Sequence, residues 1–244
     1  MGGRLVLLRR TSMDEITLTE NVLSGKLLFA FGTSVVNGHL AETSFVEDIC
    51  KANKMSYKKF CINGAASRIT DPNNIIDQIK KAPEAHPDFV VFDSIANDAY
   101  ATVTDDPSVM GQATYGYQDQ LDPRTYCGAL ETICKMLETK YQGSKLLYVA
   151  THKTPARDLR VQNIMHDVSV KIVHKWSIKV ADLYNEGNLN GFLPQYQHDY
   201  SYDKVDAHGG NHSVGGTGTH PNADGYRLFY DPIITQSLVS LATR

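Results

Sequence analysis

Residues 26–37 read "KLLFAFGTSVVN", and this stretch decides the fold class. A short apolar run passes directly into a glycine, two hydroxyl residues and the start of a helical pattern. A parallel strand that is covered on both faces, followed by a tight turn into a helix, has this form. The turn also raises a functional question, because Ser34 is either a helix cap or a nucleophile.

The same alternation of apolar runs and helical segments recurs along the chain. Strands are expected at 26–32, 58–64, 88–95, 145–151 and 179–185. Helices are expected at 44–54, 72–82, 125–141, 160–178 and 222–243, with the last bent or broken at Pro232. This order predicts an α/β fold with a doubly wound, five-stranded parallel sheet and helices on both faces. The long segments 99–124 and 186–221 are expected to be irregular loops.

Length and composition favour one globular domain. The chain has 244 residues, of which 42% are hydrophobic, and we place a single domain at 26–244. Residues 1–25 are interpreted as a lead-in segment, either a tag or a linker. The apolar run in the first ten residues is too short for a signal peptide, so a cytoplasmic location is the default, with export as part of a longer chain left open.

Charge and apolar pattern exclude several classes of partner. The net charge is −3 with scattered basic residues, which excludes the basic stripe that nucleic acid or an anionic membrane requires. No apolar stretch reaches the roughly 18 residues of a membrane span. The oligomeric state is left open.

Cysteine and histidine spacing predicts no metal or redox site. No pair of cysteines forms a CxxC motif, so we expect buried free thiols at Cys50, Cys61, Cys127 and Cys134. His208 and His212 are spaced for metal binding on a helix, but the surrounding glycines disfavour a helix and no third ligand is evident.

Small and polar residues follow the first three predicted strands. They are Gly32, Thr33 and Ser34 after the first, 63–67 after the second and 95–98 after the third. Open parallel sheets bind ligands outside the carboxyl ends of their strands, so these clusters are expected at one rim. His220 stands just before the last helix and is expected at the same rim.

These residue types together suit acyl transfer. Ser34 is the predicted nucleophile, and His220 is the base that takes its proton and then returns it to the leaving group. The backbone N–H groups of Ser34 and Gly64 and the side-chain amide of Asn97 are the candidate donors to an oxyanion.

In order and rough spacing, these motifs resemble the SGNH/GDSL hydrolases. "FGTSVVNG" is similar to the family's first motif, "NGAAS" to its second, "SIAND" to its third and "TGTHPNADGY" to its last. The resemblance implies catalytic roles for Ser34, Gly64, Asn97 and His220. It also implies a flavodoxin-like strand order of 2-1-3-4-5, hydrolysis of esters or thioesters, and no metal or other cofactor.

The chain departs from the family pattern at three positions. Thr33 stands where the family usually has Asp, and Ile95 stands where it often has Gly; both changes are expected to be tolerated. Thr217 stands where the acid of the catalytic triad is expected, three residues before His220.

Three outcomes follow from Thr217. The first is a Ser-His dyad, in which the Thr217 hydroxyl or a backbone carbonyl holds the His220 Nδ1–H. The second is a substitute acid from the preceding loop, Asp203 or Asp206. The third is a weak or inactive protein that retains a binding groove.

The predicted function is a serine esterase that cleaves small acyl esters. Candidate substrate-binding residues are Thr33, Asp98, His152 and Arg157, with a solvated loop as the alternative for the last two. Tyrosine-rich loops favour an acetyl ester of a carbohydrate. The alternative is an inactive module that binds carbohydrate or another ligand through the same cleft.

Overall fold

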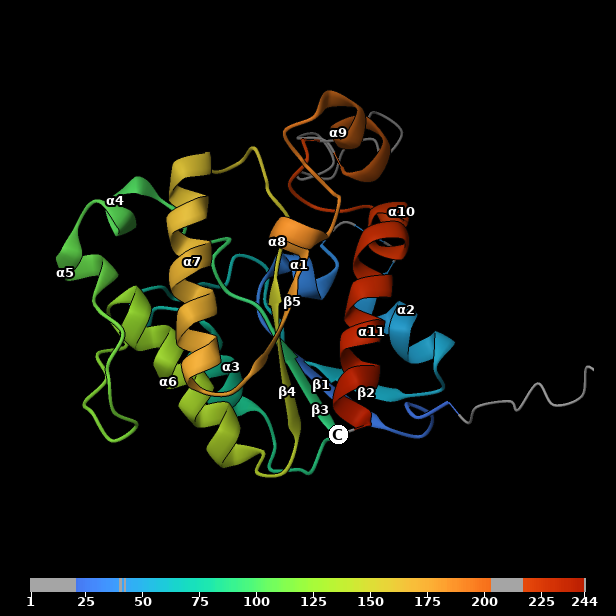
Figure 1. The fold of residues 1–244 in the computed structure, drawn as a ribbon, viewed down its shortest axis with the longest axis horizontal. Helices are drawn as coiled ribbons and strands as arrows, with labels where there is room; N and C mark the ends of the chain where they lie inside the picture. The colour runs from blue at the N-terminus through green and yellow to red at the C-terminus, as the bar shows by residue number, and fades with distance from the viewer. Residues whose placement is uncertain (1–20, 40, 42, 203–216, 244) are drawn as a thin grey trace, which may run out of the picture.

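Five parallel strands form a single sheet. The computed structural model describes residues 21–39, 41, 43–202 and 217–243 (Figure 1). The strand order is β2-β1-β3-β4-β5. The strands are β1 (Leu27–Phe31), β2 (Ser56–Lys59), β3 (Phe89–Phe92), β4 (Lys145–Ala150) and β5 (Lys179–Asp182). The predicted five-stranded parallel sheet and its order are confirmed.

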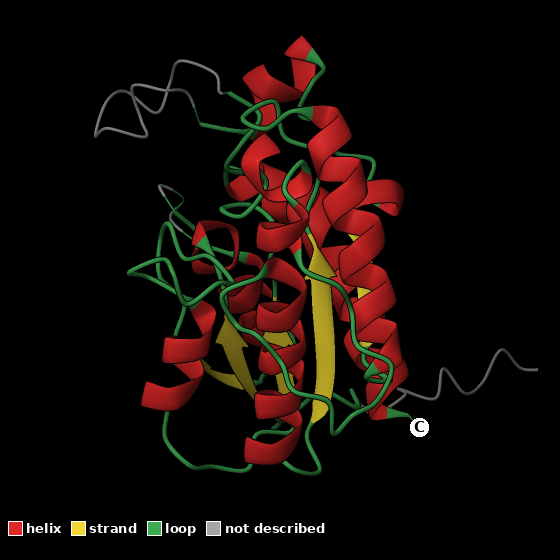
Figure 2. Ribbon diagram, turned by 90° about the vertical axis from the view of Figure 1, so that its left-hand side faces the viewer, coloured by secondary structure: helices red, strands yellow, loops and turns green. Residues whose placement is uncertain are grey.

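Helices cover both faces of the sheet (Figures 1 and 2). On one face lie α3 (Ile75–Lys81), α6 (Tyr126–Lys140) and α7 (Leu159–Lys175). On the other lie α2 (Phe45–Ala52) and α11 (Asp231–Ala242). Alternate strand residues point to opposite faces, so Phe29 and Phe31 enter the first core while Leu28 and Ala30 enter the second. The fold is therefore doubly wound, as predicted.

The segments expected to be irregular contain short helices. These are α4 (Ala101–Thr104) and α5 (Pro107–Met110) in the first segment and α9 (Pro194–Tyr200) in the second. The other short helices are α1 (Ser34–Asn37), α8 (Leu183–Glu186) and α10 (Ala223–Gly225).

The second strand differs from its prediction. β2 ends at Lys59 instead of residue 64, and as an edge strand it exposes Tyr57 and Lys58, unlike the fully buried β3. The apolar residues that suggested a longer strand serve another purpose. The Phe60 ring packs on Phe29 and Phe31, with centroids 5.2 and 5.0 Å apart.

The fifth strand also ends early, at Asp182 instead of residue 185. The Asp182 carboxylate accepts the Asn185 N–H at 3.0 Å and caps α8, which turns the chain out of the sheet.

The last helical segment is not broken at Pro232, but its hydrogen-bond pattern changes in the turn before this proline. Between α10 and α11 lies a π-helical turn, η2 (Tyr226–Tyr230), closed by a bond from the Asp231 N–H to the Tyr226 carbonyl. Pro232 occupies the first turn of α11. Proline lacks an N–H, and the predicted irregularity takes the form of this widened turn instead of a break.

The folded unit begins before the predicted boundary at residue 26. Leu23 is fully buried in the core beneath α2 and α11, and the Gly25 N–H bonds to the Lys54 carbonyl at 3.0 Å. All four cysteines are free, as expected, although Cys61 is only half-buried because the chain leaves the sheet there. Within the described residues, no helix has the length and apolar character needed to cross a membrane.

Candidate active site

The turn after β1 frees the Ser34 side chain. Thr33, not Ser34, is the N-cap of α1, because its hydroxyl accepts the Val35 N–H at 3.2 Å. Ser34 is the first helical residue and is buried. Its Oγ lies 3.0 Å from Nε2 of His220, within hydrogen-bond distance. The two side chains that sequence analysis paired are therefore in contact.

His220 is held by its neighbours at the start of the last helical segment. Its carbonyl accepts the Tyr202 N–H at 3.1 Å, and Asn222, two residues on, caps α10 by accepting the Gly225 N–H at 2.9 Å. The loop before it is anchored by His152, whose Nε2 lies 2.9 Å from the Gly218 carbonyl.

His152 positions this loop and offers no nitrogen to a ligand. Because a carbonyl only accepts, Nε2 of His152 carries the proton toward Gly218, and Nδ1 accepts from the Tyr230 hydroxyl at 2.6 Å. Burial lowers the pKa of His152 to about 4, which keeps the ring neutral. The sequence suggests His152 as a substrate-binding residue, but both its ring nitrogens bond within the protein, so neither is available to a substrate.

His220 is a neutral base without a carboxylate partner in the described residues. Burial lowers its pKa to about 4, and the nearby His39, His152 and Arg157 act in the same direction. Thr217 does not hold the His220 ring, because its N–H and its hydroxyl both donate to the Tyr202 carbonyl, at 2.7 and 3.4 Å. The substitute acids suggested by the sequence, Asp203 and Asp206, lie outside the described residues.

A second histidine packs against His220 and was missed by sequence analysis. The His39 ring meets it edge to face, with centroids 4.8 Å apart. Nδ1 of His39 accepts from the Asn63 amide at 2.8 Å, and the Asn63 oxygen accepts from Asn37 at 2.8 Å. His39 follows Ser34 by five residues, and no spacing rule distinguishes it from a surface histidine.

Of the candidate oxyanion donors that follow β2 and β3, Asn97 lines the pocket beside Ser34 and Gly64 does not. The Asn97 amide donates to the Ala65 carbonyl at 2.8 Å, which uses one of its two N–H groups, and Asn97 lines the same pocket as Ser34. Gly64 has φ +76° and is exposed, with open space where a side chain would point. It lies outside the lining of that pocket.

Two of the four candidate substrate-binding residues are buried beneath the site instead of facing it. Thr33 donates its N–H and its hydroxyl to the carboxylate of Asp93, at 2.8 and 2.6 Å. Asp98 accepts the Ser67 N–H at 2.6 Å and Nε of Arg68 at 3.0 Å. Each of the two candidates is only 1% exposed, which removes them from substrate contact.

Asp93 was not singled out from the sequence. It follows β3 directly, is fully buried, and has its pKa raised to about 7 by burial, while the hydrogen bonds from Thr33 oppose that rise. A carboxyl group at the carboxyl end of a central strand was the available signal. It holds Thr33, the residue before Ser34, through two hydrogen bonds.

The loop that carries Asn97 is strained. Ile95 has φ +72°, a left-handed conformation that is unfavourable for a β-branched residue. The side chain is buried in the first core, which offsets a strain of about 1–3 kcal/mol. Glycine adopts a positive φ without this strain, which gives a physical reason for the glycine that the resembled family often has at this position.

A pocket of about 220 Å³ adjoins Ser34 and His220. The side chains that complete its lining are mostly small: Val35, Ala96, Asn97, Thr151, His152, Thr154, Ala156, Arg157 and Thr219. Arg157 is thus the one candidate for substrate binding whose side chain lines the pocket and carries a charge.

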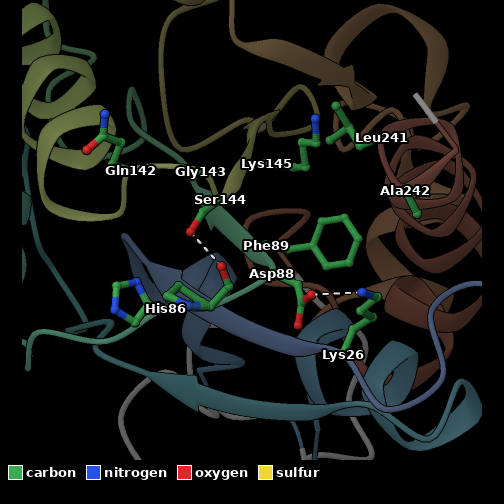
Figure 3. A pocket seen from close by; sticks show the side chains of 11 residues that line it. Lys26, His86, Asp88, Phe89, Gln142, Gly143, Ser144, Lys145, Leu241 and Ala242 are labelled. Atoms are coloured by element: carbon green, nitrogen blue, oxygen red, sulfur yellow. Dashed lines mark hydrogen bonds and ion pairs between the residues drawn. The ribbon is translucent and has the colours of Figure 1, made fainter.

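A larger hollow of about 350 Å³ lies at the opposite, amino-terminal ends of the strands (Figure 3). Two contacts join residues of its lining: Lys26 pairs with Asp88, and the Ser144 hydroxyl donates to the Pro87 carbonyl. In the part of the chain that the structure describes, no cluster of three metal-ligating side chains occurs. His208 and His212 lie outside that part.

No protein-family model and no curated protein sequence matches the chain. Many solved structures match its fold. A protein from Lactobacillus plantarum is 18% identical with a TM-score of 0.66, covering 89% of this chain and 96% of its own. A possible lipase from Chitinophaga pinensis is 12% identical with a TM-score of 0.62, over 90% of this chain and 100% of its own.

A putative GDSL-like lipase from Bacteroides ovatus is 12% identical with a TM-score of 0.60, covering 89% of this chain and 99% of its own. At such low identity the likeness establishes the fold. The predicted resemblance to the SGNH/GDSL hydrolases is confirmed at that level.

Gly32 should be indispensable to the turn. A Cβ at this position, where φ is +137°, would lie 2.0 Å from Asp93 Oδ1, so we expect Gly32→Ala to lower the free energy of unfolding by about 2–4 kcal/mol. Gly143→Ala is the matched control, because Gly143 also has a positive φ but open space around it, and we expect a loss of about 1 kcal/mol. Urea denaturation measures both, and equal losses would contradict this account of Gly32.

Thr33→Asp should destabilise the protein more as pH rises. The pKa of Asp93 is raised on folding, so the stability that its retained proton contributes is present below pH 4 and lost as pH rises toward 7. A second carboxylate beside it adds repulsion once both ionise, and we expect a loss of about 3 kcal/mol at pH 8 and a smaller one at pH 5.

Adding Asp93→Asn to that variant removes one of the two charges and should recover most of the loss at pH 8. Chemical denaturation at the two pH values gives the comparison. A loss that does not depend on pH would mean that charge repulsion is not its cause.

Proposed function

We propose that the protein is a serine esterase of the SGNH/GDSL type that cleaves small acyl esters. The observation that carries the proposal is the 3.0 Å contact between Ser34 Oγ and His220 Nε2 beside a small pocket at the carboxyl end of β1. Structural neighbours named as lipases or acylhydrolases share the fold, which adds support.

The geometry suits a two-step acyl transfer. The Ser34 oxygen bonds to the acyl carbon while its proton passes to Nε2 of His220. The resulting oxyanion accepts from the Ser34 N–H and the free N–H of Asn97, with the exposed Gly64 N–H as a third candidate. The imidazolium then protonates the departing alcohol, and water, deprotonated by the same ring, releases the acid.

The acyl group is short and the catalyst is a dyad. The pocket of about 220 Å³ lies below the roughly 300–1,000 Å³ of typical ligand sites, and its lining includes three threonines and two alanines. No carboxylate in the described residues stabilises the imidazolium of His220. In serine proteases with a Ser-His-Asp triad, loss of the acid's charge costs about 10⁴ in kcat. A modest rate is therefore expected.

A carbohydrate leaving group is the finer alternative within this proposal. The Tyr117 ring packs on Trp176 and its hydroxyl donates to the Lys175 carbonyl, while Tyr200 packs on Phe229. These tyrosines stabilise their own loops, so they give no reason to expect a sugar-binding surface. Acetylated sugars belong in a substrate panel beside simple acetyl esters.

The nucleophile can be tested directly with a fluorophosphonate probe and p-nitrophenyl acetate. We expect labelling and turnover in the parent protein, loss of both in Ser34→Ala, and a fall in turnover of at least about 10²-fold in His220→Ala. Ser108→Ala, on the exposed α5, is the control that should change neither. No labelling of the parent would favour the inactive binding module.

The pH profile tests the state of His220. Because its pKa is lowered to about 4, the imidazole stays unprotonated down to that pH. We expect kcat/KM to rise through pH 4 and to be level from pH 6 to 8, with hydrolysis measured against enzyme-free blanks.

Thr217→Asp provides a second measurement. A carboxylate that reaches the His220 ring would raise the pKa of His220 and move the acid limb of the profile to higher pH. A limb near pH 6.5 in the parent protein would show that another group already partners the ring.

A further inference from the structure

Arg157 is the described arginine without a carboxylate partner. The other four described arginines each pair with an acidic side chain: Arg68 with Asp98, Arg124 with Asp122, Arg160 with Asp105 and Arg227 with Asp224. The Arg157 guanidinium contacts neutral groups only among its described hydrogen-bond partners. A charge left uncompensated in a partly buried position is costly unless a ligand completes it.

The guanidinium is held in a fixed place. Its Nε donates to the Ala96 carbonyl at 2.9 Å, Nη1 to the Ala156 carbonyl at 2.9 Å and Nη2 to the Tyr100 hydroxyl at 3.0 Å. The same group lies over the Tyr100 ring, 4.4 Å from its centroid. Prior ordering of the side chain lowers the entropy lost when a ligand binds.

Two N–H groups remain after these bonds, one on each terminal nitrogen. A guanidinium has five N–H groups, and the three bonds above account for three of them. A pair of N–H donors on a planar cation matches the two oxygens of a carboxylate. Lysine, with a single ammonium, would reproduce the charge but not this arrangement.

Arg157 shares its pocket with the reacting groups. It lines the same cavity as Ser34 and His220, and no aspartate or glutamate is among the described residues of that lining. The remaining walls are small or neutral, so Arg157 supplies the positive potential of the cavity.

We propose that the substrate is a short ester bearing a carboxylate, which Arg157 binds while Ser34 attacks the ester carbon. This inference rests on the proposed esterase function and specifies its substrate class. The carboxylate is carried by the acyl part or by the alcohol part of the ester, and matched substrates distinguish the two.

The test compares esters that differ only by a carboxylate or its neutral amide. Monomethyl succinate against methyl succinamate places the charge on the acyl part, and acetoxyacetate against acetoxyacetamide places it on the alcohol part. We expect kcat/KM to favour the carboxylate by about 10–100-fold in one of these pairs, as a charge-assisted hydrogen bond predicts. Proton release at constant pH measures all four.

Variants assign the preference to Arg157. In Arg157→Gln the ratio of rates should fall to about 1, with the change mainly in KM, and Arg157→Lys should keep part of it. Arg160→Gln is the matched control, because Arg160 is exposed, pairs with Asp105 and lies outside the pocket, and its ratio should equal that of the parent. Added salt should reduce the preference of the parent.

Failure of this inference is distinguishable from failure of the esterase proposal. Hydrolysis with equal rates for each matched pair would overturn the role of Arg157 and leave the esterase intact. If the parent neither hydrolyses esters nor reacts with a fluorophosphonate, the role of Arg157 can still be tested by binding. Titration calorimetry on Ser34→Ala then measures the affinity for each ester. Tighter binding of monomethyl succinate or acetoxyacetate than of its amide supports the inference, and equal binding of both pairs refutes it.

Discussion

The pair of hydrogen bonds from Thr33 to the buried carboxylate of Asp93 is the constraint on which the site depends. It ties the end of β1 to the end of β3, which are neighbours in the sheet, and it fixes the turn that leads from β1 into α1. Gly32 must lack a side chain for the carboxylate to come this close. With Thr33 engaged as the helix cap, the next hydroxyl, that of Ser34, is left for His220.

The sheet was accessible from the sequence because its central strands are continuous apolar runs. β2 was misplaced because an edge strand has one hydrogen-bonded neighbour and tolerates polar side chains, while the apolar residues that follow it pack elsewhere. Leu23 was excluded because a polar segment precedes it, and only tertiary packing shows its burial. Sequence periodicity reports local structure and is silent about such contacts.

The site was predicted in part for a similar reason. Ser34 and His220 could be paired, since parallel strands gather their carboxyl ends at one rim. Asp93, His39 and the ring contacts of His152 depend on the approach of segments that are distant in sequence. Two departures from the family motif also gain a physical explanation: Thr33 suits a neighbouring carboxylate better than Asp does, and the burial of Ile95 offsets its unfavourable backbone angle.

The chain of contacts from Tyr230 through His152 to Gly218 makes the geometry of the site depend on the docking of distant segments. Tyr230 belongs to the π-helical turn, and it holds the histidine that in turn holds the loop before His220. Ser34 follows the first strand and stands 186 residues before His220, so the two side chains meet only when the last helical segment packs against the sheet. The contact between Ser34 and His220 is therefore a property of the whole folded unit and not of either segment alone.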